Sequence, residues 1–251
     1  MKPSRILLCL GFSLCLGLSL KAQSSLYHGG YGHFGVGPAW YNSDELVKYL
    51  QKPSVLGPSL DWNSLGYSAG AEGYAEIRGL LLGGGGYALV LPSQSTDSAI
   101  VWTGMGHGFF KSGYVFFQNG RQFAAVMAGF GGGALGVDIK NNSYNTDIEF
   151  DPRDPIQPND EKGYYLAYAI FDFNLSYKFV SSSPHGEQQG RYGGFMFGID
   201  AGSTFGLRMD EWRHDGSATS NINAPDNYFS PYLRLTIGGG GFKRPVDLNQ
   251  E

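Results

Sequence analysis

Apolar and polar residues alternate along most of the chain after Ser24, and a period of two predicts β-strands with one apolar and one polar face. The pattern recurs in eight runs: His33–Tyr41, Leu65–Arg78, Leu80–Pro92, Ala99–Phe117, Phe123–Ile139, Gly163–Phe179, Gly193–Met209 and Tyr228–Phe242. Each run meets or approaches the ~9–11 residues that a tilted strand needs to cross a bilayer. The sequence therefore predicts eight strands of membrane-crossing length.

The two faces of a run differ in chemistry. In the sixth run one face carries Tyr165, Phe171, Phe173, Leu175 and Phe179, and the other carries Tyr168, Asp172, Asn174, Ser176 and Lys178. The polar faces hold too few charges for a wall that faces water, and aromatics such as Phe195 and Phe229 lie near run ends, as in interfacial girdles. We therefore expect the apolar face to contact lipid. A secreted, soluble lipocalin-like barrel, with the apolar face inward, is the alternative.

The connections between the runs alternate in length. Short ones lie at Gly79, at Asn119-Gly120 and at 181–191, and the others are 42–63, 93–98, 140–162 and 210–227. A barrel with both termini in the periplasm has short turns on that side and longer loops outside. Counting from the N-terminus places all four members of the second set outside.

The composition favours a membrane barrel over a soluble enzyme. The chain has 39 Gly, 16 Tyr and 17 Phe, and only 16% of its residues are charged, against about 25% in soluble domains. No stretch of the mature chain is long and apolar enough for a transmembrane helix, so a membrane protein of this sequence would have to be a closed barrel. The net charge of −4 provides no basic face, and no nucleic-acid partner is expected.

The first 22 residues have the features of a secretory signal peptide. Lys2 and Arg5 precede the apolar segment Ile6–Leu20, and we expect cleavage after Ala22. The mature barrel would then span residues 23–251. Both cysteines, Cys9 and Cys15, lie in the signal, so the mature chain would have no disulfide, thiolate metal site or cysteine nucleophile. Lipidation is the alternative, but neither cysteine follows the small residue that a lipoprotein signal requires.

Together, the signal, the eight alternating runs, the short turns and the long loops resemble the small OmpA/OmpX-like outer-membrane barrels. The signal ending Leu-Lys-Ala-Gln and the Gly- and Tyr-rich strands look especially like barrel proteins common in Bacteroidota. The resemblance covers essentially the whole mature chain and rests on pattern, not on a motif. It implies an all-β, eight-stranded antiparallel up-and-down transmembrane β-barrel in the cell outer membrane, with outer-membrane lipid around it and the barrel-assembly machinery as a partner.

The C-terminus departs from that family pattern. Such barrels usually end on an aromatic residue that the assembly machinery recognises, whereas here Phe242 is followed by Lys243–Glu251. Either Phe242 serves that role with a short tail beyond it, or the recognition differs.

Charges on the polar faces would line the lumen. An eight-stranded barrel is only just wide enough for its own side chains, and charges in so narrow a space must pair. We predict an ion-pair network that fills the barrel, with an acidic partner for Arg234; a narrow ion or proton path and a catalytic carboxylate pair are the alternatives. The predicted network consists of Glu72, Glu76, Arg78, His107, Lys111, Asp172, Lys178, Asp200, Arg208 and Arg234.

The glycine runs and the histidines offer little further chemistry. Gly131, Gly133 and Gly136 formally match a dinucleotide fingerprint, but no helix follows to hold a pyrophosphate. We interpret the glycines as room for bulky neighbours, which the tyrosines of adjacent strands would fill. No histidine pair has zinc-ligand spacing with a third ligand nearby, so no metal or other cofactor is predicted.

Three connections carry hypotheses of their own. Residues 140–162 include Asp147, Glu149, Asp151, Asp154, Asp160 and Glu161, which form either a solvated loop or a calcium site. His214, Asp215 and Ser217 suggest rim-sited hydrolysis but are also ordinary loop residues. Asn42 and Glu45 form a capping-box pattern before Leu46, Val47 and Leu50, which predicts a short helix that lids the barrel, rests on the membrane or docks a partner.

The expected function is that of a non-enzymatic outer-membrane barrel with a filled lumen, acting as structural support or binding a protein partner through its outer loops. A small pore or transporter and a rim-sited lipid-modifying enzyme are the alternatives.

Overall fold

A computed structural model describes residues 28–42, 44–119, 121–181, 191–218, 222 and 227–243. The predicted signal peptide at residues 1–22 and most of the 181–191 connection lie outside these ranges. No helix in the described part of the chain is long and apolar enough to cross a bilayer.

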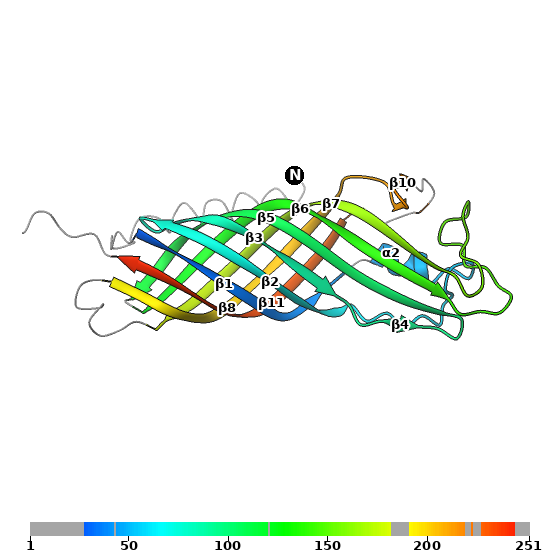
Figure 1. Ribbon diagram of the computed structural model, residues 1–251, viewed down its shortest axis with the longest axis horizontal. Helices are drawn as coiled ribbons and strands as arrows, with labels where there is room; N and C mark the ends of the chain where they lie inside the picture. Colours follow the sequence, from blue (N-terminus) through cyan, green and yellow to red (C-terminus); the bar gives the residue numbers. More distant parts are fainter. Residues whose placement is uncertain are drawn as a thin grey trace, which may run out of the picture.

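Eight of the described strands pair in one closed antiparallel ring (Figure 1). They are β1 (His28–Trp40), β2 (Leu65–Ile77), β3 (Leu80–Val90), β5 (Ala99–Asn119), β6 (Gln122–Asn141), β7 (Glu161–Val180), β8 (Arg191–Arg208) and β11 (Asn227–Lys243). Each pairs with its neighbour along the chain, β1 also pairs with β11, and β7 pairs with β8, so no strand of the ring has a free edge. The predicted eight-stranded up-and-down barrel is confirmed, with every predicted run on its own strand.

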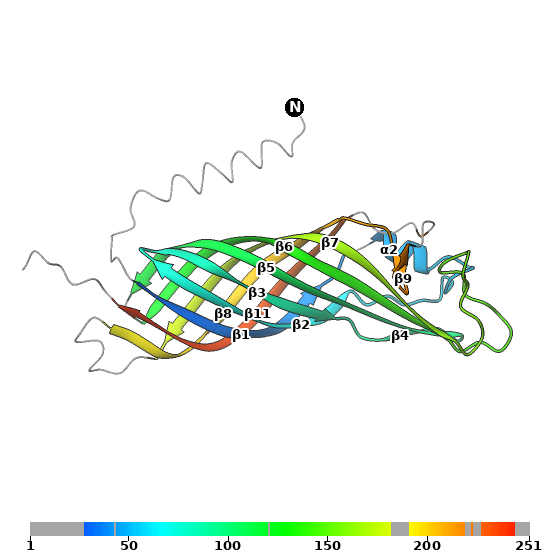
Figure 2. The ribbon, with the colours of Figure 1, turned by 45° about the horizontal axis from the view of Figure 1, so that its top comes forward.

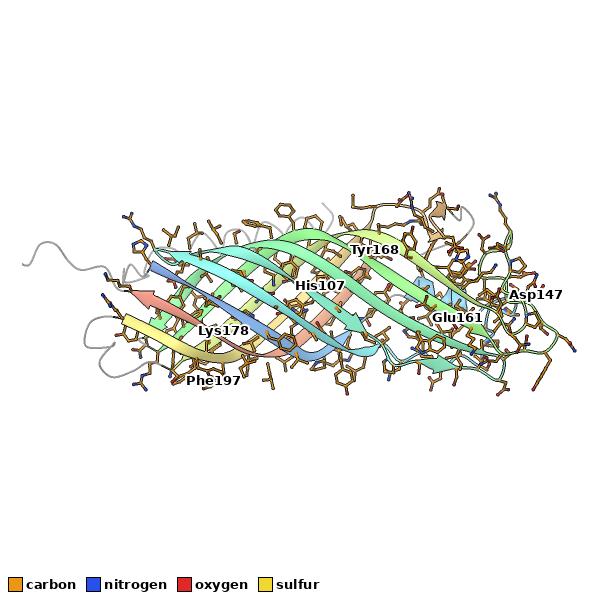
Figure 3. All side chains as sticks on the ribbon, in the orientation of Figure 1. His107, Asp147, Glu161, Tyr168, Lys178 and Phe197 are labelled. Atoms are coloured by element: carbon orange, nitrogen blue, oxygen red, sulfur yellow. The ribbon has the colours of Figure 1, made fainter. Side chains whose placement is uncertain are left out.

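The outer wall is apolar and the interior is polar. Phe197 and Ile237 are among the large apolar side chains exposed on the outside, whereas Lys178 and Arg234 are buried inside. Figure 3 labels Lys178 within the outline of the barrel and Phe197 at its edge. The soluble lipocalin-like alternative places the apolar face inward and is therefore wrong for this chain.

The barrel has a turn end and a loop end. At the turn end β2 and β3 are joined by Arg78 and Gly79, whose φ angles of 54° and 81° are both positive, as a two-residue type I′ hairpin requires. The prediction that Arg78 faces the lumen is therefore wrong: the tight turn takes Arg78 out of the strand, and its side chain is exposed.

The loop end carries a packed cap (Figure 2). It includes helix α2 (Asp44–Leu50), the two-residue strand β4 (Gln94–Ser95), which pairs with β5, and the hairpin of β9 (Arg213–His214) and β10 (Ser217–Ala218). Acidic residues in the first turn of α2 and Lys48 in its last turn complement the helix dipole. The predicted helix is confirmed, although Asn42 lies outside it, in a β-bridge to Phe229.

Helix α2 packs over the barrel mouth. Leu46 and Leu50 are buried in one apolar cluster with Phe150 of the 140–162 connection and Trp212. The Tyr49 hydroxyl donates a hydrogen bond to the Phe150 carbonyl at 2.6 Å. Burial and nearby carboxylates raise the pKa of Tyr49 to about 12, so this donor keeps its proton at neutral pH. Of the three roles predicted for the helix, the structure matches that of a lid.

The topology predicts which end proteases reach. Tyr144 lies in the 140–162 connection and is 89% exposed. Chymotrypsin added to intact cells should cut after Tyr144, and Tyr144→Ser should remove that cleavage. Cleavage within 181–191 in sealed cells would show that the barrel is inserted the other way round.

The two faces predict opposite responses to charge. Ile237, 51% exposed on the outer wall, should tolerate leucine, whereas Ile237→Arg should lower the free energy of unfolding by about 2–4 kcal/mol if the site is near the midplane.

Arg234 is 2% exposed inside the barrel. Arg234→Leu should lower the free energy of unfolding by about 2 kcal/mol or more, because it removes a desolvated cation from two aromatic faces. Denaturant titration of vesicle-refolded protein measures both values, and a harmless Ile237→Arg would contradict the lipid-facing assignment.

Candidate functional site

The barrel interior is the candidate site, because strand alternation directs polar side chains from many strands to one axis. His33 comes from β1, Glu72 from β2, Lys111 from β5 and Asp172 from β7, and all four are buried. Figure 3 labels three other buried residues, His107, Tyr168 and Lys178, within the outline of the barrel.

One charge centre forms around Lys111. Its Nζ lies 2.8 Å from Glu72 Oε1 and 2.7 Å from Asp172 Oδ1, and it donates to Asn174 Oδ1 at 3.2 Å. Asp172 also accepts hydrogen bonds from Thr204 and Tyr232. Five strands are thus tied together through one ammonium group and its two carboxylates.

A second centre forms around Asp200. Lys178 Nζ lies 2.7 Å from Asp200 Oδ1 and donates to Thr236 Oγ1 at 2.7 Å. His33 Nε2 lies 3.3 Å from Asp200 Oδ2 and 3.8 Å from Glu72 Oε2, so it lies between the two centres. The sequence-based prediction missed His33, although its place in the first alternating run was a signal that could have identified it.

Arg234 is held by aromatic rings. Its Cζ lies 3.5 Å from the ring centroid of Tyr87 and 3.6 Å from that of Tyr232, and its Nε donates to Ser68 Oγ at 3.1 Å. Asp200 stands opposite Arg234 in the strand register but pairs with Lys178 instead. The expectation of an acidic partner for Arg234 is therefore wrong among the described residues: two π faces and a hydroxyl take that place.

The remaining predicted residues lie towards the two ends. Glu76 is buried near the turn end, and neither of its carboxylate oxygens has a hydrogen-bond partner in the described part of the chain. His107 is buried farther along β5, with its ring 5.6 Å from that of Phe109. Arg208 is half-buried at the loop end and donates through Nε to the Asp210 carbonyl at 2.7 Å. Arg208 therefore belongs to the rim rather than to the central network.

Inward-facing glycines make room for the tyrosines. A Cβ on Gly70 would lie 2.6 Å from Tyr87 Cδ1, and one on Gly35 would lie 2.8 Å from the Tyr87 hydroxyl. A Cβ on Gly83 would meet Tyr74 Cδ1 at 2.7 Å. Each ring thus lies against a wall without side chains, as the sequence predicted.

Both ends of the polar interior are closed by apolar side chains. At the turn end, Tyr31 packs near Phe123 and Phe242, with ring centroids 5.4 and 6.0 Å away. At the loop end, Tyr168 packs edge-on against Tyr228, beneath the cap that contains α2. The charges between these layers are separated from water on both sides.

Among the described residues, the donor atoms of His33, Glu72 and Asp200 come close enough to consider a metal, all within 4.8 Å of one another. Lys111 and Lys178 already neutralise these two carboxylates at 2.7–2.8 Å. A divalent cation would have to bind beside two ammonium groups, so the arrangement fits an ion-pair cluster better than a metal centre.

The loop residues considered for chemistry make structural contacts. Asp151 accepts a hydrogen bond from the Arg153 amide, and Asp154 Oδ1 lies 2.5 Å from Lys162 Nζ. His214 Nδ1 lies 2.8 Å from the Gly163 carbonyl. In the described part of the chain, no side-chain hydrogen bond joins His214 to Ser217.

No protein-family model and no curated protein sequence matches the chain. Among solved structures, the attachment invasion locus protein Ail of Yersinia pestis overlays with a TM-score of 0.46 and 11% identity, covering 85% of this chain and 98% of that one. The Neisserial surface protein NspA gives 0.40 and 8%, covering 86% and 97%, and the outer membrane protease OmpT of Escherichia coli gives 0.38 and 11%, covering 90% and 99%. At these scores the overlays carry no argument about activity. The chain's own strand pairing, closure and outward apolar face are those of a small outer-membrane barrel.

Proposed function

We propose that this protein is a non-enzymatic, integral outer-membrane barrel whose lumen is sealed and whose packed loop cap binds a partner outside the cell. The observation that carries the proposal is the buried charge network closed at both ends. Inside the barrel, Lys111 and Lys178 hold carboxylates of other strands at 2.7–2.8 Å. A continuous water path would require these pairs to separate in a space with little room for new positions.

The outer surface supports membrane insertion. Lipid cannot hydrogen-bond to exposed backbone groups, and only a closed sheet satisfies them internally. The apolar wall would contact outer-membrane lipid, and the turn end would face the periplasm, where the barrel-assembly machinery delivers such proteins.

The cap supports a role in binding rather than transport. Helix α2 and the 140–162 connection share one apolar cluster, so the cap presents a packed surface. Residues 140–162 contain six acidic residues and three basic ones, Lys140, Arg153 and Lys162. The charge of this surface favours a partner with a basic face.

The sealed lumen predicts the electrical behaviour of the barrel. Purified, refolded protein in a planar bilayer should show no steady open channels, and heat-modifiable gel migration should confirm that the same sample is folded. Brief flickers are consistent with ion pairs that break and re-form. Steady, large channels would refute the sealed lumen and favour the small-pore alternative.

A further inference from the structure

Two cationic side chains and a histidine lie side by side at the turn end of the barrel. In the strand register Arg191 of β8 stands opposite Lys243 of β11, and Lys243 stands opposite His28 of β1. All three side chains are exposed, and none has an ion-pair partner in the described part of the chain. Because neighbouring strands lie about 4.8 Å apart, the trio forms a short basic row along the rim.

A hollow adjoins this row. Its volume is about 340 Å³, and it is lined by these three residues together with Tyr192, Gly193, Gly241 and Phe242. Among the described residues, no carboxylate contributes to this lining. The hollow therefore combines positive charge with the backbone of two glycines.

The outer wall next to the hollow is bare of side chains. Moving from the rim towards the middle of the barrel, the register places two rows of outward-facing glycines: Gly193, Gly241 and Gly30, then Gly239, Gly32, Gly73 and Gly84. Phe195 stands beside Gly239 and Phe110 beside Gly84, so large rings bound the second row on both sides. The wall is a trough about four strands wide.

We propose that this trough and the basic row form a binding site for one anionic glycerophospholipid of the periplasmic leaflet. The phosphate lies against Arg191, Lys243 and His28, and an acyl chain lies along the glycine floor. The inference rests on the proposed orientation, with the turn end at the periplasm. In this orientation the basic row lies at the membrane interface and the glycine floor lies towards the midplane. A phospholipid has the same order, with its charged headgroup at the interface and its acyl chain towards the midplane.

The electrostatics favour a lipid over a second copy of the barrel. Guanidinium and ammonium groups make charge-assisted hydrogen bonds to phosphate oxygens, and Arg191 and Lys243 together offer several. A two-fold contact through the trough would bring the same patch of two barrels together. Arg191 and Lys243 of each copy would then approach like charges, which opposes association.

Native mass spectrometry of the refolded full chain tests the site. The protein is released from mixed micelles that contain equal amounts of phosphatidylglycerol and phosphatidylcholine. We expect one retained phosphatidylglycerol, and retention about tenfold lower in Arg191→Gln/Lys243→Gln because two charge-assisted contacts are lost. Lys48→Gln/Lys140→Gln removes the same charge at the loop end and should retain the lipid.

A second variant tests the floor independently of the charges. A Cβ on Gly241 would meet its nearest atoms at 3.7 and 3.8 Å, an ordinary contact. Gly241→Leu should therefore fold, keep its cations and still lose the lipid, because the leucine side chain occupies the trough.

Each other outcome overturns the inference. Equal retention of the two lipids would refute the headgroup site. Displacement by inorganic phosphate together with normal binding to Gly241→Leu would show a simple anion site. A lipid-free dimer would show that a second copy covers the trough. Heat-modifiable migration of the same samples shows whether the barrel is folded. A folded barrel that retains no lipid refutes this inference alone. A chain whose migration does not change with heating refutes the proposed function as well.

Discussion

Closure of the sheet is the constraint on which the rest of this structure depends. Every strand of the ring must pair on both sides, and the pairing of β7 with β8 and of β1 with β11 completes it. In a bilayer an open edge would leave a row of unsatisfied amide and carbonyl groups, each costing several kcal/mol. Closure with eight strands also fixes a narrow interior. The chemistry inside the barrel follows from that width.

A narrow interior brings polar side chains into contact, and two kinds of packing accommodate them in this chain. Lysines bridge carboxylates from different strands, so the charges that would be costly alone stabilise one another. Tyrosines lie against glycines of adjacent strands and fill space that a Cβ would otherwise occupy. Arg234 combines charge and aromatic packing, because its guanidinium lies against the rings of Tyr87 and Tyr232. Side chains of the barrel's own strands thus occupy this part of the interior.

The two ends of the barrel differ in charge and in structure. The loop end carries an acidic, packed cap in which α2 and the 140–162 connection share an apolar cluster. The turn end carries short connections and the basic row of Arg191, Lys243 and His28. The two ends therefore present surfaces of opposite charge.

The sequence by itself determined the strands, their two faces and the short helix. Alternation is a local property, and the apolar positions of each run could be assigned without knowing its neighbours. The lumen-facing positions of Lys111, Asp172 and Lys178 follow from that alternation alone. Run ends are the exception: alternation continued through Arg78 predicts a lumen-facing side chain, whereas the two-residue turn takes Arg78 out of the strand and exposes it.

Only the tertiary structure decided which lumen residues bind each other. Glu72 and Lys111, for example, lie on strands separated by β3, and their relative height depends on the register of both pairings between them. Closure, for the same reason, placed His33 between two charge centres and gave Asp200 to Lys178 rather than to Arg234. The period of two specifies a direction for each side chain, whereas the partner is set by the shear of the closed barrel, which no single run encodes.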